Sequence, residues 1–456
     1  MFRITDQAFI EQANEIEQIK SISVLQGLKY HILTYGCQMN EHDSEKMSGM
    51  LEDMGYLETP DTQTADLIII NTCAVRENAE MKVLGNIGHL KPIKEENPNL
   101  IIAICGCMMQ EPEMVEKIKK SYPYVDLVFG THNYHSLPRF LYRALTQKAR
   151  VFEVEEDNAL IIEGLPVKRK KGVKAFVTIM QGCNNFCSYC IVPYTRGRER
   201  SREIQSIVDE VRGLVSDGVK EVTLLGQNVN SFKPSFVSLL EAVNDIDGLE
   251  RIRFMTSHPK DFSEELIDAM ARLDKVCESI HLPLQSGSNA ILKAMNRKYT
   301  REDYLEKVEI LKKRLPGVSI STDIIIGFPG ETQSDVDDTI DMIKRVGYDS
   351  AFTFIYSKRT GTPAAEKVDP TPKEVIQERF EGMLQALNEM VIEKNKDRED
   401  QIYEVLVDDL KEEGKLQGRT REGFLVSFDG PKALLGTLQE VRITRAKKFS
   451  LEGQIL

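Results

Sequence analysis

The chain has 456 residues, a length that predicts two to four domains, each large enough to bury a hydrophobic core. Its net charge of −12 argues against indiscriminate nucleic-acid binding, which depends on a broad positive field, but it leaves room for a local basic surface. No apolar run reaches membrane-spanning length and the charged N-terminus lacks a signal-peptide core, so we expect a cytoplasmic protein without membrane association. In that compartment the eight cysteines are metal ligands or buried thiols rather than a disulfide framework.

The first part of the chain predicts a parallel-sheet domain at residues 29–147, preceded by an acidic extension at residues 1–28 that is helical or disordered. Apolar runs that read as strands alternate with polar, helix-like segments, the first of which runs from about Asn40 to Gly55. Strand–helix alternation of this kind implies a doubly wound sheet with right-handed crossovers. The predicted strands are Tyr30–Thr34, Leu67–Ile70, Leu100–Ile104 and Leu127–Phe129.

Three cysteines of this domain, Cys37, Cys73 and Cys107, each fall just past the carboxyl end of a predicted strand. Those ends share one edge of a parallel sheet, where ligands bind, so the three thiols are expected to converge. Thiolates are the common ligands of iron–sulfur clusters, and three of them would leave one iron of a cube open. The alternative is that these are small buried side chains. Cys105 lies two residues before Cys107, and spacing alone does not choose between the two.

Residues 148–172 read as a charged linker that leads into the basic run Lys168–Lys174. Such a run is either a solvated connector or a contact for a phosphate backbone.

A second group of cysteines, Cys183, Cys187 and Cys190, has the spacing C-x3-C-x2-C and directly follows the apolar run Phe176–Met180. Three thiolates on one short loop hold three corners of an iron–sulfur cube and leave the fourth iron open for chemistry. Structural zinc instead needs a closed set of four Cys or His ligands. No further Cys or His follows at a spacing that would close the set.

Residues 173–398 predict six strand–helix units and therefore an incomplete barrel, whose active site lies at the carboxyl ends of the strands. The second cysteine group follows the first of these strands, at the expected place. Cys277, in the helix-like stretch Leu273–Ser279, is interpreted as a core thiol. The predicted strands are Phe176–Met180, Val222–Leu225, Ile252–Met255, Ile280–Leu284, Ser319–Ile326 and Phe352–Tyr356.

Polar loops follow four of the later strands, and three of these loops contain glycine. Glycine lets the backbone approach a ligand, and Gln and Ser supply hydrogen bonds without net charge. Each loop taken singly is also compatible with an ordinary turn or helix cap, and only their recurrence on one rim favours a ligand site. The residues in these loops that we select as ligand contacts are Gly226, Gln227, Ser257, Gln285, Ser286 and Gly327.

The C-terminal residues 399–456 predict a small all-β module, after a helix-like segment that runs from Pro372 to Asp400. Short alternating runs at Ile402–Val407, Phe424–Phe428 and Leu438–Ile443 are its strands. Basic groups near an aromatic ring suit RNA, although a solvated barrel face is the alternative. The groups concerned are Arg419, Arg421, Phe424, Arg442, Arg445, Lys447 and Lys448.

The loop C-x3-C-x-aromatic-C, with Tyr189 as the aromatic residue, resembles that of radical S-adenosylmethionine enzymes. From about Lys29 to the end, the chain resembles the methylthiotransferase family, which joins a domain with three separated cysteines, a radical S-adenosylmethionine partial barrel and a C-terminal RNA-binding TRAM barrel. The stretch Gly36–Asn40 with Asp43–Glu45, and the stretch Cys190–Arg202, are similar to the tRNA-modifying branch that acts on N6-(dimethylallyl)adenosine.

The resemblance implies two 4Fe-4S clusters, one on Cys183, Cys187 and Cys190 and one on Cys37, Cys73 and Cys107, with Cys105 as a spare thiol. It implies that S-adenosylmethionine contacts Tyr189 and the rim-loop residues selected above. The implied reaction abstracts hydrogen from C2 of the adenine at position 37 of the anticodon loop and replaces it with sulfur and a methyl group. We assign no catalytic residue beyond the cluster ligands. The expected partners are the anticodon stem-loop of tRNA and an electron donor such as flavodoxin or ferredoxin, and the expected state is a monomer.

Other readings remain open at this point. The acceptor could be threonylcarbamoyl-adenosine or a ribosomal protein, which nucleoside analysis would separate. A two-cluster electron carrier would leave the rim loops and the basic module without a purpose. An RNA-binding protein with structural metal would not cleave S-adenosylmethionine.

Overall fold

The computed structural model describes residues 6–74, 77–155, 163–169 and 172–456. Two compact units contain these residues. The first takes in the N-terminal part of the chain together with Gln181–Asn184 and Ile191–Ser201, and the second takes in the remainder. Of the predicted basic run Lys168–Lys174, Lys170 and Lys171 lie outside the described residues.

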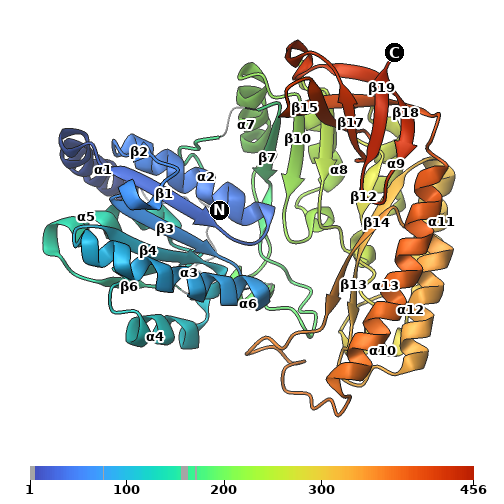
Figure 1. Ribbon diagram of the computed structural model, residues 1–456, viewed down its shortest axis with the longest axis horizontal. Helices are drawn as coiled ribbons and strands as arrows, with labels where there is room; N and C mark the ends of the chain where they lie inside the picture. Colours follow the sequence, from blue (N-terminus) through green and yellow to red (C-terminus); the bar gives the residue numbers. More distant parts are fainter. Residues whose placement is uncertain (1–5, 75–76, 156–162, 170–171) are drawn as a thin grey trace. The chain divides into compact units, whose positions relative to one another are not determined.

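The N-terminal unit is built on a six-stranded, fully parallel sheet with the strand order β2-β1-β3-β4-β5-β6 (Figure 1). Every residue of β3 and β4 is buried, as expected for central strands that are covered on both faces. The strands are β1 (Lys29–Thr34), β2 (Leu57–Glu58), β3 (Leu67–Thr72), β4 (Ile101–Gly106), β5 (Leu127–Phe129) and β6 (Val151–Glu153).

Helices cover both faces of this sheet, which confirms the predicted doubly wound architecture. Helices α1 (Asp6–Gln26), α2 (Gln38–Asp53) and α5 (Leu137–Gln147) pack on one face. Helices α3 (Glu77–Glu96) and α4 (Pro112–Ser121) pack on the other. The order β2-β1-β3 reverses direction between β1 and β3, and ligands of open parallel sheets bind at such a switch point.

Two segments that the sequence placed outside this domain belong to its fold. The predicted extension at residues 1–28 contains α1, whose Ile19 is fully buried against the sheet. The predicted linker contains Val151–Glu153, which add the edge strand β6 beyond the expected domain end. Strands β2 and β6 are short and each includes a glutamate, so they lack the uninterrupted apolar run that identified the equally short β5.

The second unit begins with two three-stranded parallel sheets, ordered β7-β10-β11 and β12-β13-β14 (Figure 1). A bridge between Ile252 and Val276 joins the two sheets, so the six strands follow one another as predicted for an incomplete barrel. The strands are β7 (Lys174–Thr178), β10 (Glu221–Leu225), β11 (Arg251–Phe254), β12 (Ser279–His281), β13 (Ser319–Ile326) and β14 (Ser350–Ile355).

Alternate residues of these strands face opposite sides. Val222, Leu224 and Ile252 join the hydrophobic core under the helices. Their neighbours in sequence, such as Arg251 and Arg253, point to the other side of the sheet. The helices are α7 (Ile204–Ser216), α8 (Phe236–Asn244), α9 (Glu264–Arg272), α10 (Asn289–Ala294), α11 (Arg301–Arg314), α12 (Gln333–Val346) and α13 (Lys373–Lys396).

The prediction of helix across Leu273–Ser279 is wrong, although Cys277 is buried as expected of a core thiol. Helix α9 ends at Arg272, and Val276 already pairs with Ile252 of the neighbouring strand. Because this stretch is shorter than two helical turns, its apolar spacing could not separate a helix from a loop that leads into a strand.

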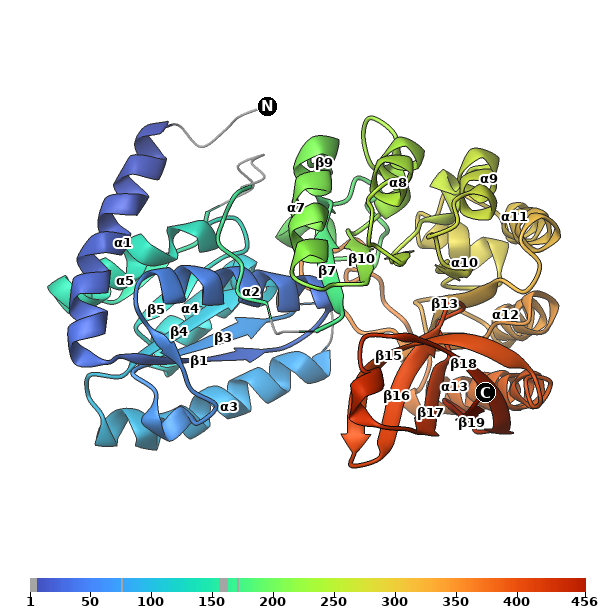
Figure 2. The ribbon, with the colours of Figure 1, turned by 90° about the horizontal axis from the view of Figure 1, so that it is seen from above.

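A closed five-stranded barrel follows α13, with the order β15-β16-β17-β19-β18, and confirms the predicted all-β module (Figure 2). Its strands are β15 (Ile402–Glu412), β16 (Lys415–Thr420), β17 (Leu425–Asp429), β18 (Leu438–Ala446) and β19 (Leu451–Ile455). The sequence missed β16 and β19, which hold few apolar residues because a small barrel buries only alternate side chains. Among the described residues, none of the helices has the length and apolarity needed to cross a lipid bilayer.

Candidate functional site

The three separated cysteines of the N-terminal unit lie at the switch point of its sheet. Cys37 follows β1, Cys73 follows β3 and Cys107 follows β4, and β3 pairs with both of the other strands. Each cysteine therefore stands at the carboxyl end of its strand, where the sheet leaves room for a ligand. Cys37 is also the residue that directly precedes α2.

Two glycines bring these loops into close contact. Gly36 has φ +111°, and a Cβ atom added there would lie 2.5 Å from Cβ of Cys73. Gly106 has φ +97°, and a Cβ atom there would lie 2.4 Å from the Thr72 carbonyl oxygen. Both conformations are accessible to glycine without strain, so the glycine before each of Cys37 and Cys107 sets the approach of the loops.

A buried amide network fixes the loops against one another. Asn40 donates from Nδ2 to the carbonyl oxygens of Tyr35, at 2.8 Å, and Thr72, at 2.7 Å. Asn71 donates from Nδ2 to the Asn40 carbonyl at 2.9 Å and to the Ser44 hydroxyl at 3.0 Å. Because Asn40, Asn71, Thr72 and Ser44 are buried, these bonds hold the cysteine loops in one arrangement.

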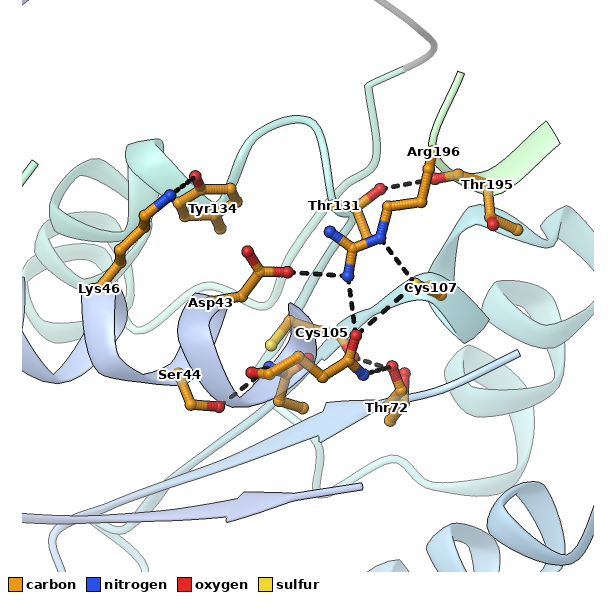
Figure 3. Close-up of polar contacts among 12 residues, drawn as sticks. Asp43, Ser44, Lys46, Thr72, Cys105, Cys107, Thr131, Tyr134, Thr195 and Arg196 are labelled. Carbon is orange, nitrogen blue, oxygen red and sulfur yellow. Dashed lines mark hydrogen bonds and ion pairs between the residues drawn. The ribbon is translucent and has the colours of Figure 1, made fainter. Parts of the chain in front are cut away.

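Arg196 enters this site from the chain segment after the second cysteine group (Figure 3). Its Nε lies 3.2 Å from Sγ of Cys107, and its Nη2 lies 2.7 Å from Oδ1 of Asn40 and 2.8 Å from Oδ2 of Asp43. The Thr131 hydroxyl donates to the Thr195 carbonyl at 2.7 Å and anchors the segment. A buried cation paired with Asp43 therefore stands directly beside a proposed cluster ligand.

The structure separates Cys105 from Cys107. Cys105 packs in the core under α2, with its Sγ 3.8 Å from Sδ of Met47, whereas Cys107 contacts Ala74 and Ile191. Gly106 breaks the extended alternation between them, so the two thiols do not share a side as a continuous strand would require. Cys107 is the one placed with Cys37 and Cys73, which supports the choice made from the family resemblance.

The protonation of the Cys107 thiol fits a ligand that binds a metal. Burial raises the pKa of the Cys107 thiol to about 12, while Arg196 lowers it and the neighbouring Cys73 and Cys37 raise it. A thiol of this kind releases its proton when a metal binds. Within the described part of the chain, no three Cys, His, Asp or Glu side chains surround a single metal-ion position. A cube does not need such a position, because each thiolate binds a different iron.

The second cysteine group is divided between the two units: Cys183 belongs to the first, Cys187 and Cys190 to the second. In the second unit, Arg297 donates from Nη1 to Sγ of Cys187 at 3.3 Å and from Nη2 to the Pro283 carbonyl at 3.1 Å. Tyr189 packs against a buried cluster that contains Phe328, and burial raises the pKa of its hydroxyl.

Unusual backbone conformations gather near the carboxyl ends of the barrel strands. Phe186 in the cysteine loop, Thr256 after β11 and Gln285 after β12 have φ of +47°, +67° and +72°. A left-handed conformation costs a residue other than glycine of order 1–3 kcal/mol and clusters at ligand sites. Asn296 holds the loop by donating from Nδ2 to the Phe186 carbonyl at 2.9 Å.

The predicted ligand contacts lie at the ends of their strands, but several have partners within the protein. A Cβ atom at Gly226 would lie 2.5 Å from Cγ of Met180, and one at Gly327 would lie 2.6 Å from Cγ2 of Ile376. Both glycines thus serve packing, and their contact with a cofactor stays a prediction. Ser286 is buried and accepts from the Ser288 amide at 3.3 Å.

Three predicted residues have polar side chains that suit a ligand contact. Ser257 is buried, and its hydroxyl has no hydrogen-bond partner among the described residues. Gln285 is buried, and its main chain pairs with Asp323 and Ile325. Gln227 follows Gly226 in the loop after β10, and its amide oxygen is buried.

Part of the predicted basic surface of the C-terminal barrel makes contacts within the protein. Arg421 donates to Glu278 at 2.7 and 2.9 Å and to the Val276 carbonyl at 2.9 Å, and Arg398 lies over the Phe424 ring at 3.9 Å. Arg421 and Phe424 thus have partners within the protein, from the partial barrel and from the residues just after α13, and their contact with RNA stays a prediction. Sequence position does not reveal such partners.

Of the remaining basic groups, Arg419 lies on β16 and donates to the Gly423 carbonyl at 3.0 Å, and the others lie on β18 and the turn that follows it. Arg442 and Arg445 are exposed, and Lys448 lies 4.8 Å from the centre of the Phe449 ring, which is 77% exposed. Asn395 fixes the turn by donating to the carbonyls of Lys447 and Lys448 at 2.9 and 3.0 Å. We call Arg442, Arg445, Lys448 and Phe449 the β18 surface.

Sequence reasoning overlooked the two arginines that contact cysteine sulfur, Arg196 and Arg297. Arg196 stands in a run with Arg198, Arg200 and Arg202, a pattern that reads as exposed surface. The one available signal was its proximity in sequence to Cys190. Arg297 follows a helix with no motif around it, so only the tertiary structure could identify it.

Three family models match the chain: the Radical SAM superfamily at residues 177–343, the Uncharacterized protein family UPF0004 at 29–130, and the TRAM domain at 397–456. Among solved structures, the radical S-adenosylmethionine methyltransferase TsrM from Kitasatospora setae has a TM-score of 0.55 at 17% identity, covering 74% of this chain and 75% of that one. This likeness supports the fold alone.

The curated relatives match over nearly the whole chain. The tRNA-2-methylthio-N(6)-dimethylallyladenosine synthase of Alkaliphilus oremlandii (strain OhILAs) is 54% identical and covers 99% of this chain and 98% of its own. The protein of the same name from Clostridium perfringens (strain 13 / Type A) is 55% identical, covering 93% and 97%. The chain therefore belongs to the radical S-adenosylmethionine methylthiotransferases, in the family of the tRNA-2-methylthio-N(6)-dimethylallyladenosine synthases.

Proposed function

We propose that the protein methylthiolates C2 of N6-(dimethylallyl)adenosine at position 37 in the anticodon loop of tRNA. The observation that carries this proposal is the placement of Cys37, Cys73 and Cys107 at one switch point, in a chain that also has a radical S-adenosylmethionine loop. A radical enzyme that only cleaves its cofactor has no need of a second set of cluster ligands. An enzyme that inserts sulfur needs a sulfur source.

Membership of the radical S-adenosylmethionine superfamily implies S-adenosylmethionine and a 4Fe-4S cluster. In our proposal Cys183, Cys187 and Cys190 hold that cluster, and Cys37, Cys73 and Cys107 hold a second one. When bound, these groups supply a 5′-deoxyadenosyl radical for the adenine C2–H bond and the sulfur and methyl group that replace the hydrogen.

Protein residues position these groups. Arg297 orients Cys187 by its hydrogen bond to the sulfur, and Asn296 holds the left-handed turn at Phe186. Ser257 and Gln285 offer polar groups at the strand ends for S-adenosylmethionine, together with Tyr189, Gly226, Gln227, Ser286 and Gly327. The amide network around Asn40 keeps the second cysteine group preorganised, which lowers the cost of ordering the ligands.

For the RNA, we propose the β18 surface as the part of the C-terminal barrel that contacts the anticodon stem-loop. Its cations suit phosphates and its exposed aromatic ring suits an unstacked base. The net charge of −12 makes such a local surface necessary for binding an anion. We further propose that a flavodoxin- or ferredoxin-type protein donates the electron and that the enzyme acts as a monomer.

Two measurements test the function. The first is nucleoside analysis of tRNA incubated with reconstituted enzyme: we expect 2-methylthio-N6-(dimethylallyl)adenosine, and a methylthio group on threonylcarbamoyl-adenosine or on protein would favour another acceptor. The second is iron content with Mössbauer spectra, for which we expect about eight irons in wild type and about four in a variant with Cys183, Cys187 and Cys190 changed to alanine. About four irons falling to none would remove the proposed sulfur source.

A further inference from the structure

The segment that follows the second cysteine group covers the first one. Residues 191–201 belong to the N-terminal unit, and Ile191 packs with Ala74 and Cys107 in a small buried cluster. The bond from Thr131 to the Thr195 carbonyl fixes the segment one residue before Arg196. The backbone therefore delivers the Arg196 side chain into the cysteine site in a defined position.

The surroundings of Arg196 make its charge act mainly on the cysteine group. The residue is 3% exposed, so little water screens the guanidinium. Its contacts are Cys107 through Nε, and Asn40 and Asp43 through Nη2, while its buried Nη1 has no partner among the described residues. Figure 3 shows the guanidinium between Asp43 and Cys107.

The direction of the electrostatic effect follows from this geometry. Three thiolates give the cysteine group negative charge, and reduction of a bound cluster adds one more. A buried cation that donates a hydrogen bond to a ligand sulfur stabilises the more negative, reduced form, because hydrogen bonds to sulfur and net charge set cluster potentials. Asp43, on the other side of the guanidinium, works in the opposite direction.

We propose that Arg196 is a positioning residue of the cluster on Cys37, Cys73 and Cys107: it orients Cys107 and raises the reduction potential of that cluster, with Asp43 as the counter-charge that limits the effect. The inference rests on the proposed second cluster. The segment after the radical S-adenosylmethionine loop then has a second role, which is to set the reduction potential of the sulfur-supplying site.

The test uses the full chain with Cys183, Cys187 and Cys190 changed to alanine, so that one cluster remains. Iron content is measured first, and then the midpoint potential by redox titration followed by electron paramagnetic resonance. Arg196→Gln is expected to lower the reduction equilibrium constant at least tenfold, which is a shift of about 59 mV to more negative potential. Asp43→Asn is expected to shift the potential in the opposite direction.

Two further variants serve as controls. Arg196→Lys keeps the charge and is expected to recover most of the wild-type potential. Arg139→Gln removes the same charge from an exposed ion pair with Glu153 in the same unit, and is expected to leave the potential unchanged.

The outcomes separate the inference from the proposed function. If the background protein contains no cluster, the second cluster itself is wrong. If the cluster is present and Arg196→Gln shifts its potential no more than Arg139→Gln does, the second cluster stands and the role of Arg196 is refuted. If Arg196→Gln prevents cluster assembly, Asp43→Asn decides: an unchanged or lowered potential there overturns the electrostatic role.

Discussion

Replacing Arg251 by alanine should loosen the C-terminal barrel from the partial barrel. Arg251 is fully buried on β11 and donates to the Arg419 carbonyl at 2.7 Å, to the Glu404 carbonyl at 3.0 Å and to the Glu404 carboxylate at 2.8 Å. Arg253 makes parallel bonds to the carbonyls of Arg421 and Thr420, at 2.8 and 2.6 Å. These contacts join the partial barrel to β15, to the end of β16 and to the turn that follows β16.

The geometry lets us assign the energy among the contacts of Arg251. The Glu404 side chain is 44% exposed, so its ion pair with Arg251 is screened and contributes at most about 1 kcal/mol. The two carbonyl oxygens are bonded by a buried charge, and losing such a partner costs about 1–3 kcal/mol for each. Arg251→Ala is therefore expected to cost about 3–5 kcal/mol, a typical value when one member of a buried network is removed. Glu404→Gln, as the matched control, should cost less than about 1 kcal/mol.

Hydrogen–deuterium exchange of the peptides that cover Arg251–Phe254 and Arg419–Phe424 measures this difference. A loss of 3–5 kcal/mol in the free energy of local opening speeds exchange by roughly two to three and a half powers of ten. Glu404→Gln should accelerate it less than about tenfold. If the two variants accelerate exchange equally, the carbonyl bonds do not carry the contact and the reasoning is wrong.

Three further results are expected. Cys107→Ala should remove about four irons from the reconstituted protein, whereas Cys105→Ala, in the core under α2, should leave about eight. An equal loss of iron in the two variants would contradict the assignment of Cys107 rather than Cys105 as the ligand. Burial is the main cause that raises the pKa of Glu331 to about 7. Between about pH 4.5 and 7 this carboxyl group ionises in the unfolded state but not in the folded state, so about 3 kcal/mol of stability is lost as the pH rises. Glu331→Gln should abolish this pH dependence of urea unfolding, and a pH dependence parallel to that of wild type would refute the reasoning. Phe449→Ala should weaken binding of an anticodon stem-loop by roughly 5- to 150-fold, the value of one stacked base, and an unchanged Kd would exclude the ring from the RNA interface.

The contacts between the barrels also change how the RNA role of the C-terminal module should be tested. Deleting residues 399–456 would strip Arg251 and Arg253 of their carbonyl partners and leave Glu278 without Arg421. Uncompensated buried charge destabilises the remaining barrel, so loss of activity after deletion would not report on RNA binding alone. Substitutions on the β18 surface avoid this problem because those side chains lie outside the contact.

Local sequence patterns determined most of the architecture. Alternating apolar runs and helical periodicity gave the order of strands, and that order implies parallel sheets with their ligand sites at the carboxyl ends. The spacing of Cys183, Cys187 and Cys190 on one loop, and the position of Cys37, Cys73 and Cys107 after three strands, needed no coordinates to be recognised. The short strands β2 and β6 were missed because each includes a glutamate and so lacks an uninterrupted apolar run like that of β5.

Tertiary structure alone decided which polar side chains meet. Cys105 and Cys107 differ by two positions, yet the left-handed Gly106 sends one into the core and the other to the cysteine site. Arg196 contacts Asp43, which lies 153 positions earlier in the sequence, and Arg421 forms an ion pair with Glu278. The burial of a side chain and its partners depend on which residues the folded chain places nearby. The local sequence around an arginine is the same whether its side chain is exposed to solvent or lies beside a buried sulfur.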